Sequence, residues 1–371
     1  MASAAIEFVV GGAGAQRRCG DALSQVMAMR DDRLDRYRGQ RVMVTGGLGF
    51  IGSNLGMRLL ELGAEVLLVD ALIPETGGNA FNVDPIKDHP CLSIRKVDIR
   101  DILTMERLLR DQDIVFNLAG QVSHLDSMSD PFTDLEINCR SQLALLEACR
   151  RNAPWVKVVF ASTRQIYGRV PADRLPIKES EPPSPVDVNG INKLGGERYH
   201  ILYNNVHGIR GCVLRLTNTY GPRMLVKNDR QTFIGWFVRQ VIEGEEIRLF
   251  GDGLQLRDLT YVDDAVQAFL LAGVDEAADG QVFNVGGLRP YSLREIAETL
   301  IDVAGNGSCR LVPFPPDRKA IDVGSVYVDD GKLRESLGWQ PTTDLRQGLE
   351  RTAAFYRQHA EHYLERLPLL V

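Results

Sequence analysis

Glycines and one carboxylate near the start of the regular part of the chain could together bind a dinucleotide. Residues 45–52 read TGGLGFIG. Glycine is needed where a backbone turns sharply and where it approaches a pyrophosphate closely, and a helix starting there offers free N–H groups to the anion. Asp70 follows about twenty residues later, where a carboxylate can bind ribose hydroxyl groups and repel a 2′-phosphate. The segment predicts a dinucleotide site that favours NAD over NADP.

The elements that must position these residues alternate between two kinds. Short, almost continuously apolar runs predict buried strands, and longer amphipathic stretches between them predict helices. This alternation indicates an α/β protein with a Rossmann-type, doubly wound parallel sheet that is covered on both faces. The predicted strands are residues 41–45, 65–70, 92–97, 114–118, 156–161 and 212–216, and the longer helices are 135–151 and 191–203.

The texture of the sequence suggests three parts. Residues 1–38 read as an N-terminal extension of unknown purpose, in which Gly11, Gly12 and Gly14 are not followed by a convincing strand, turn and helix. Residues 39–216 read as the dinucleotide-binding domain, with a returning segment near 257–285. Residues 217–371 contain more loops and shorter elements, which predicts a smaller C-terminal α/β substrate domain that could close over the carboxyl ends of the strands.

Composition excludes several other classes of protein. The net charge of −6 gives no support to binding of nucleic acid or of an anionic membrane surface, and no apolar run is long enough to span a bilayer. The six cysteines are scattered without a CxxC pair, so neither a zinc site nor a disulfide framework is expected. We therefore expect a cytoplasmic protein without a metal.

The spacing Gly46-x-x-Gly49-x-x-Gly52 resembles the extended short-chain dehydrogenase/reductase family, in particular its NAD-dependent epimerase/dehydratase branch. The resemblance extends from about residue 40 to 345, and it includes Asn138, which is similar to a structural asparagine of the family. It implies a set of NAD-binding positions: Gly46, Gly49, Phe50, Ile51, Gly52, Asp70, Asp98, Ile99, Leu118, Ala119, Gly120 and Lys193.

The same resemblance implies a nucleotide-activated sugar as substrate. Asn218, in the stretch LRLTNTYGPR, is similar to a contact for the sugar nucleotide's phosphate, and Arg257 is similar to a pyrophosphate-binding arginine. Arg318 also falls in the second domain, and the planar fork of arginine suits phosphate geometry. Both arginines could instead pair with neighbouring carboxylates.

The predicted catalytic site departs from the family pattern. The resemblance implies a Ser or Thr at the end of the fifth strand, which Thr163 supplies, and a Tyr-x-x-x-Lys helix. Lys193 fits the lysine, but the tyrosine position holds Asn189, and an amide cannot act as a general base. Gln165 stands where the family's dehydratases and decarboxylases usually carry an acid.

Three explanations for the missing tyrosine remain open. His124 follows the fourth strand in a loop that would face the nicotinamide end of the cofactor, and histidine suits proton transfer at neutral pH. It could equally be a hydrogen-bonded loop residue. Tyr167 is another nearby phenol, and Asn189 could position a water while Lys193 holds the cofactor's ribose.

These residues favour an NAD-dependent nucleotide-sugar epimerase that acts through a transient keto-sugar. The alternatives are a dehydratase or decarboxylase with a rearranged acid/base set, and a non-catalytic protein that binds NAD and a nucleotide sugar. The helices at 135–151 and 191–203 resemble those that form a four-helix dimer interface in the family, which implies a homodimer.

Overall fold

A seven-stranded parallel sheet forms the centre of the protein. The computed structural model describes residues 31–364 apart from positions 75, 229, 231, 316–318, 320 and 321. The strand order is β10-β6-β5-β4-β1-β2-β3, and every neighbouring pair is parallel, which confirms the predicted fold class. The strands are β1 (Arg41–Thr45), β2 (Glu65–Asp70), β3 (Leu92–Lys96), β4 (Ile114–Asn117), β5 (Lys157–Thr163), β6 (Gly211–Leu216) and β10 (Val282–Val285).

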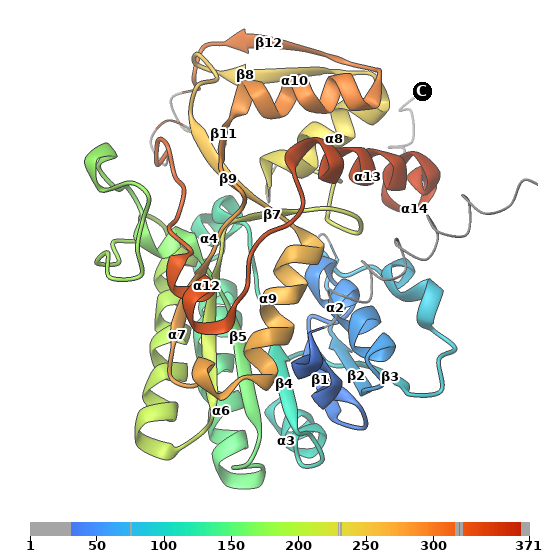
Figure 1. Cartoon of the computed structure of the whole chain (residues 1–371), viewed down its shortest axis with the longest axis vertical. Coiled ribbons are helices and arrows are strands. Elements are labelled where there is room, and N and C mark those ends of the chain that lie inside the picture. The colour runs from blue at the N-terminus through green and yellow to red at the C-terminus, as the bar shows by residue number, and fades with distance from the viewer. Residues whose placement is uncertain are drawn as a thin grey trace, which may run out of the picture.

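Helices cover both faces of this sheet (Figure 1). Alternate residues of β1 show the two layers, because Val42 and Val44 belong to one hydrophobic cluster and Met43 to another. The first cluster includes residues of α2 (Phe50–Glu61) and α9 (Val262–Val274). The second includes residues of α3 (Ile102–Leu109), α6 (Ser141–Asn152) and α7 (Val188–His207).

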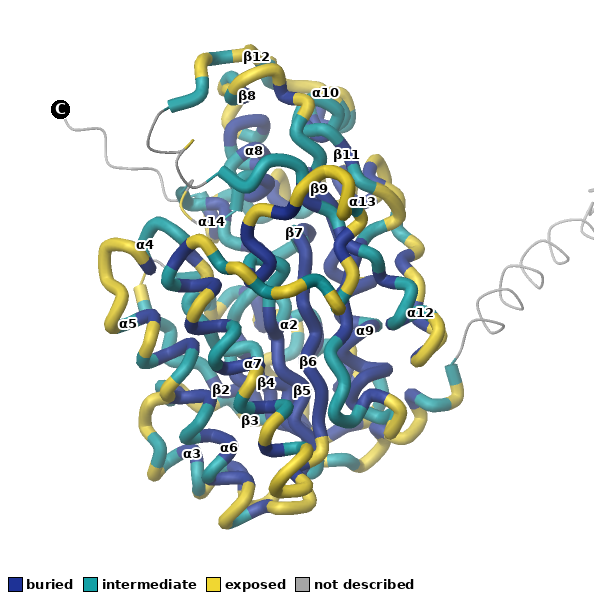
Figure 2. Tube along the Cα trace, turned by 90° about the vertical axis from the view of Figure 1, so that its left-hand side faces the viewer, coloured by how far each residue is buried: buried dark blue, intermediate teal, exposed yellow. Residues whose placement is uncertain are grey.

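The central strands are buried on both sides. All six residues of β6 are buried, and β5 is buried except at Thr163 (Figure 2). This accounts for their continuous apolar sequence, since a parallel strand with helices on both faces has no solvent-facing side. Polar side chains can therefore reach a ligand only beyond the strand ends.

A smaller region lies beyond the carboxyl ends of the strands (Figure 1). It contains a three-stranded sheet of order β11-β9-β7 and a two-stranded sheet of β8 and β12. Between these segments, α9 packs on the large sheet and β10 is its edge strand. The strands are β7 (Asn218–Tyr220), β8 (Glu246–Phe250), β9 (Leu256–Tyr261), β11 (Pro290–Ser292) and β12 (Ser308–Val312). The helices are α8 (Phe233–Glu243), α10 (Leu293–Ala304), α12 (Gly331–Leu337), α13 (Leu345–Gln358) and α14 (Ala360–Tyr363).

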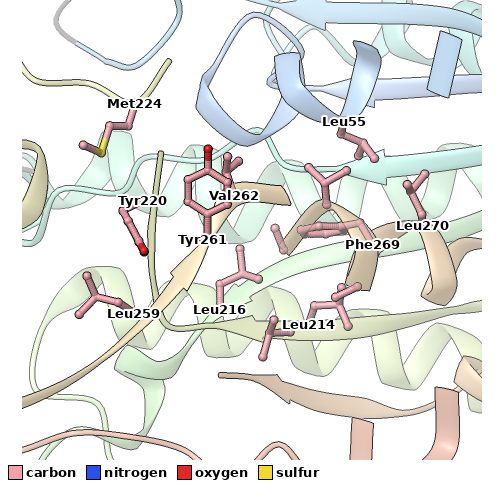
Figure 3. Packing of buried hydrophobic residues seen from close by; sticks show 14 of the residues in the cluster. Leu55, Leu214, Leu216, Tyr220, Met224, Leu259, Tyr261, Val262, Phe269 and Leu270 are labelled. Atoms are coloured by element: carbon pink, nitrogen blue, oxygen red, sulfur yellow. The ribbon is translucent and has the colours of Figure 1, made fainter. Parts of the chain in front are cut away.

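One hydrophobic cluster joins the two regions, as Figure 3 shows. Leu214 and Leu216 from β6 lie in it with Phe269 from α9, and Tyr261 and Leu259 bring in β9. Because these side chains share one buried core, the smaller region is held against the sheet rather than tethered by loops alone.

The last residues of the expected extension belong to the folded core. A short 3-10 helix, Asp32–Tyr37, buries Leu34 and Tyr37, and the Tyr37 hydroxyl donates to the carbonyl of Leu270 at 2.8 Å. Arg33 donates to Asp275 and to the carbonyl of Leu337, both at 2.9 Å. Residues 1–30, with the glycines at 11–14, lie outside the described residues.

Among the described residues, no helix has the length and apolar character to cross a bilayer. The same residues contain no cluster of three or more potential metal ligands.

Candidate active site

A cavity of about 550 Å³ lies at the carboxyl ends of the central strands. It is lined by Thr45 of β1, Asp70 of β2, Thr163 of β5 and Leu216 of β6, and by loop residues after β4. Sheets of this order bind ligands at this edge, where the strand order reverses between β1 and β4. Of the predicted site residues, the cavity is lined by Gly46, Gly49, Phe50, Ile51, Gly52, Asp70, Asp98, Ile99, Leu118, Ala119, Gly120, His124, Thr163, Gln165, Asn189, Lys193, Asn218 and Arg257.

The glycine turn between β1 and α2 leaves no room for side chains. Gly46 adopts a φ of +67°, and a Cβ on Gly52 would lie 2.2 Å from the Gly46 carbonyl oxygen. Gly49, the N-cap of α2, provides no side-chain cap. The N–H groups of the first turn, starting at Phe50, are therefore available to an anion that approaches the turn.

Two carboxylates follow the next strands along the sheet edge. Asp70 accepts hydrogen bonds from the backbone N–H groups of Leu48 (3.0 Å) and Leu72 (2.8 Å), and burial raises its pKa above the ordinary value despite these bonds. Asp98 lines the cavity beside Ile99. Its pKa is lowered by the hydrogen bond from the Arg100 guanidinium, 2.6 Å away.

Lys193 is almost completely buried in α7 against the loop after β4. Its ammonium group donates to the carbonyl of Ala161 at 3.3 Å, and a Cβ on Gly120 would lie 2.6 Å from Nζ. Burial lowers the pKa of Lys193 to about 8, opposed by the charge of Asp134. Glycine at position 120 therefore leaves the ammonium group space at the cavity wall.

Asn189, one helical turn before Lys193, is held in a buried polar cluster. Its side-chain nitrogen donates to the carbonyl of Gln121 (2.8 Å) and to Oδ2 of Asp134 (2.9 Å). The fully buried Asp134 carboxylate also accepts from Asn138 (3.0 Å) and Asn192 (2.8 Å). The amide at the tyrosine position therefore helps to satisfy the hydrogen-bond acceptors of a buried carboxylate.

His124, the first residue of α4 (His124–Ser129), contacts two polar side chains at the cavity wall. Its Nδ1 is paired with Oδ2 of Asp187, and its Nε2 faces the side-chain amide nitrogen of Gln165. Asp187 is buried, and it also caps α7 by accepting from the N–H of Gly190 at 2.7 Å. Burial raises the pKa of Asp187, but the hydrogen bond and charge of His124, together with the Gly190 N–H and the charge of Arg164, hold it below the ordinary value.

The other candidates near His124 are arranged differently. Thr163 lines the cavity, where its hydroxyl accepts from the N–H of Gln165 at 3.2 Å. Tyr167 is buried away from the cavity. Its hydroxyl donates to Asn284 and accepts from Arg215, both at 2.7 Å, and burial raises its pKa to about 12. This geometry gives Tyr167 no access to a ligand in the cavity.

The predicted substrate residues lie on the side of the smaller region. Asn218, on β7, lines the cavity and donates to the carbonyl of Asp258 at 3.0 Å. Arg257, on β9, lines it too, and it is held by the carbonyl of Gly324 at 2.5 Å and by Asp322 at 3.6 Å. Arg318 lies outside the described residues.

Comparison with known proteins agrees with this geometry. The model of the NAD dependent epimerase/dehydratase family matches residues 42–286. The chain belongs to this family. The match covers both the glycine turn and Arg257, so membership in the epimerase/dehydratase family confirms the resemblance on which the NAD and nucleotide-sugar predictions rest.

Relatives within the epimerase/dehydratase family include enzymes of two reaction types. The UDP-glucose 4-epimerase of Mycolicibacterium smegmatis is 32% identical over 323 residues, spanning 86% of this chain and 100% of that protein. The dTDP-glucose 4,6-dehydratase of Streptomyces griseus is 31% identical over 323 residues, spanning 86% and 94%. The structure of the UDP-glucose 4-epimerase of Thermotoga maritima with UDP-glucose has a TM-score of 0.78 at 32% identity, covering 86% of this chain and 99% of that one.

The residues of the cavity fit the family's NAD. The turn at Gly46 and Gly52 excludes side chains from the place where a pyrophosphate would approach the first turn of α2. Asp70 keeps a carboxylate at the end of β2, which suits ribose hydroxyl groups. Lys193 adds a buried cation at the opposite wall.

Two residues of this epimerase/dehydratase site were missed by sequence reasoning. Asp187 pairs with His124 across 63 positions of the chain, and its only sequence signal is that of a helix N-cap. Arg164 lines the cavity between Thr163 and Gln165, and the family pattern assigns no role to it. Both follow from the folded arrangement rather than from spacing.

Proposed function

We propose that this protein is an NAD-dependent nucleotide-sugar epimerase that acts through a transient keto-sugar and uses His124, oriented by Asp187, as its acid–base group. The observation that carries this proposal is the His124–Asp187 pair at the cavity wall, beside Thr163 and Gln165. The catalytic assignment replaces the family's tyrosine with an imidazole.

The cofactor would be held by the glycine turn, Asp70, the pair at Asp98 and Ile99, and the ammonium group of Lys193. NAD, when bound, accepts a hydride from the sugar and later returns it. Lys193 remains largely charged at neutral pH, because its pKa is lowered only to about 8. A cation near the reacting carbon would stabilise the alkoxide that forms when the alcohol loses its proton.

His124 is arranged to receive the proton of that alcohol. With Nδ1–H donating to Asp187, the Nε2 lone pair faces the Gln165 amide nitrogen, and a sugar hydroxyl would donate to Nε2 in place of that amide. Asp187 stabilises the imidazolium that forms when the proton arrives. Thr163 supplies a hydroxyl on the same wall, and the same imidazole returns the proton when the ketone is reduced.

A dehydratase or decarboxylase is the weaker alternative. Elimination of water requires an acid that protonates the departing hydroxyl group. Among the described residues that line the cavity, the only carboxylates are Asp70, Asp98 and Asp126, and Asp126 is paired with Arg230 at 3.6 Å. Gln165 provides no such proton. A relative named as a UDP-glucose 4-epimerase is therefore a better guide than one named as a dehydratase.

The substrate is a sugar nucleotide whose diphosphate would lie between Asn218 and Arg257. Both residues reach the cavity from the smaller region. The similar structure from Thermotoga maritima was solved with UDP-glucose, which supports a nucleotide sugar as the substrate. Arg318 remains a proposed substrate contact. The division of the chain into domains at 39–216 and 217–371 also remains a proposal.

A homodimer is part of the proposal. The helix α5 (Pro131–Leu135) exposes Phe132 and Leu135, and α7 exposes Ile191, Leu202 and Val206. Exposed apolar side chains on adjacent helices favour burial against a second copy of the chain. Sedimentation velocity tests this, because a monomer at micromolar concentration would contradict it.

The decisive experiment combines a substrate panel with isotopic labelling. The purified protein, with its bound dinucleotide identified by mass, is incubated with UDP-, CDP-, GDP- and dTDP-sugars in deuterated water. Products of unchanged mass formula and inverted configuration are expected, and NMR locates the inverted carbon. Deuterium in the product places the inversion beside the ketone, whereas inversion without deuterium places it at the oxidised carbon.

Two results would overturn the proposal. Loss of water or carbon dioxide from the sugar would establish the dehydratase or decarboxylase alternative. Tight binding of NAD and of a nucleotide sugar without any product would favour a non-catalytic binding protein.

A further inference from the structure

Arg164 is a cation in the cavity wall for which the described part of the chain provides no direct partner. It is partly buried and lines the cavity, and among the described residues it makes no hydrogen bond or ion pair. Burial, followed by the charge of Arg257, lowers the pKa of Arg164 to about 10. A guanidinium stays protonated at neutral pH and has five N–H donors, so leaving it unpaired in a partly dehydrated place costs stability.

The carboxylates near Arg164 already have other partners. Asp187 pairs with His124 and accepts from Gly190, while Asp258 accepts from Gly287 at 2.7 Å and from Val328 at 3.2 Å. Asp322 contacts Arg257 at 3.6 Å and accepts from Gly324 at 3.2 Å. The charges of these three carboxylates raise the pKa of Arg164 from a distance, but none of the three forms an ion pair with it. Among the described residues no carboxylate is therefore left to pair directly with Arg164, which favours an anionic group of a ligand as its partner.

The position of Arg164 indicates which part of the ligand that is. It follows Thr163 and precedes Gln165, which faces His124, so it belongs to the wall where the sugar reacts. Arg257, the proposed partner of the diphosphate, lines the same cavity, and its charge lowers the pKa of Arg164. In the proposed function, the sugar ring would lie between the reacting wall and the diphosphate. A planar guanidinium binds a carboxylate through two parallel hydrogen bonds.

We infer that Arg164 is a specificity-determining residue that binds the carboxylate of the sugar, which makes the substrate a nucleotide-activated uronic acid. This inference rests on the proposed function, because it requires a nucleotide sugar in the cavity. Nucleotides that carry a neutral hexose should therefore bind more weakly than those that carry a uronic acid.

Calorimetric titration of the NAD-loaded protein with matched ligand pairs tests the inference. UDP-glucose and UDP-glucuronate differ only in an exocyclic CH2OH or carboxylate, and GDP-mannose and GDP-mannuronate form a second pair for another base. The acidic member is expected to bind roughly tenfold to a hundredfold more tightly, the range of a charge-assisted hydrogen bond. Arg164→Gln should abolish this preference and change the affinity for the neutral member by less than about threefold.

Two further variants separate the role of Arg164 from charge and from folding. Arg164→Lys keeps the charge without the fork, and it should retain part of the preference. Arg230→Gln removes another cavity-lining arginine, one that is exposed and paired with Asp126, and it should leave the preference intact. Thermal melting of each NAD-loaded variant establishes that it is folded.

The outcomes are distinguishable. Equal binding of both members by the wild type overturns the inference alone. If Arg164→Gln weakens both members to the same extent, Arg164 binds the diphosphate and the inference is wrong. If neither member of either pair binds, the proposed function fails and the inference fails with it.

Discussion

At the β1–α2 end of the cavity the chain offers its backbone to a ligand, whereas at the β5–α7 end it offers side chains that hold one another. The first end depends on a steric requirement, since a Cβ on Gly52 would lie 2.2 Å from the Gly46 carbonyl oxygen. The second depends on pairs such as His124 with Asp187 and Asn189 with Asp134.

The two ends therefore tolerate change differently. A backbone site admits only glycine at its closest points, so its pattern in the sequence stays recognisable. A side-chain site can be rebuilt when a few residues exchange partners, provided that every buried polar group is satisfied again. Asn189 illustrates this, because its amide joins a buried cluster. In the proposed function, His124 takes over proton transfer.

The largest effect should come from removing the proposed acid–base group. His124→Asn is expected to lower kcat by about 10² to 10⁴-fold, the usual contribution of general acid–base catalysis, with the content of bound NAD unchanged. Steady-state kinetics and release of the bound dinucleotide measure the two quantities. His89→Asn, at an exposed loop position, is the matched control. A kcat within about twofold of wild type would remove His124 from the mechanism.

The next effect concerns the buried lysine. Because burial lowers the pKa of Lys193 from 10.5 to about 8, the unfolded chain binds a proton that the folded apoprotein has lost between these pH values. This single group should therefore raise the free energy of unfolding by roughly 3 kcal/mol as pH rises through that window. Urea unfolding of wild type and Lys193→Met from pH 7 to 10 isolates the contribution as a difference of slopes.

Lys87→Met is the control for this comparison. Lys87 is exposed and pairs with Asp84 at 2.8 Å, so its removal should leave the slope between pH 8 and 10 unchanged. Parallel stability profiles of wild type and Lys193→Met would show that Lys193 is not held with a lowered pKa.

The backbone end should respond more modestly to loss of one charge. Asp70→Asn keeps the size of the side chain and its acceptor oxygen, but it weakens the hydrogen bonds to ribose hydroxyl groups. We expect roughly tenfold weaker NAD binding and a smaller discrimination against NADP, measured by titration of the apoprotein with both dinucleotides. Asp84→Asn, at an exposed position, should bind both as the wild type does. Unchanged selectivity would mean that Asp70 serves only the turn at Leu48 and Leu72.

The sequence was sufficient to predict the parallel sheet and the glycine turn after its first strand. Strands such as β6 are apolar throughout because both faces are covered, and the glycine turn has a local spacing. The catalytic end could be predicted only as a set of alternatives. The partner of His124 lies 63 residues away, and Asn284, which accepts a hydrogen bond from the Tyr167 hydroxyl, lies 117 residues away from Tyr167. Such contacts between distant segments are decided by the tertiary fold.

Arg164 shows the same limit in another form. Its neighbours Thr163 and Gln165 were predicted from family positions, yet an arginine between them has no local signature. Its proposed role in binding a ligand rests on three nearby carboxylates that already have other partners. Only the folded arrangement shows these contacts.

The smallest effect on turnover is expected when the family's tyrosine is restored at position 189, because this change should not increase kcat. Asn189→Tyr removes the side-chain nitrogen that donates a hydrogen bond to Asp134 at 2.9 Å. It also places a phenol at a position where Asn189 is only 1% exposed. We expect no increase in kcat and a loss of stability of about 1–3 kcal/mol, the cost of leaving a buried acceptor short of a donor. Asn205→Tyr, at an exposed position of α7, controls for a tyrosine in this helix.

Combining Asn189→Tyr with His124→Asn makes the comparison sharper. If the imidazole has taken over proton transfer and the amide position has been absorbed into the buried cluster, the double variant should be no faster than His124→Asn alone, because the phenol cannot reach the sugar hydroxyl without disturbing Asp134. Recovery of activity in the double variant would show that the tyrosine position still faces the reacting carbon. The β5–α7 end would then have changed by a single exchanged side chain, at position 189, and not by a rearrangement of its side-chain contacts.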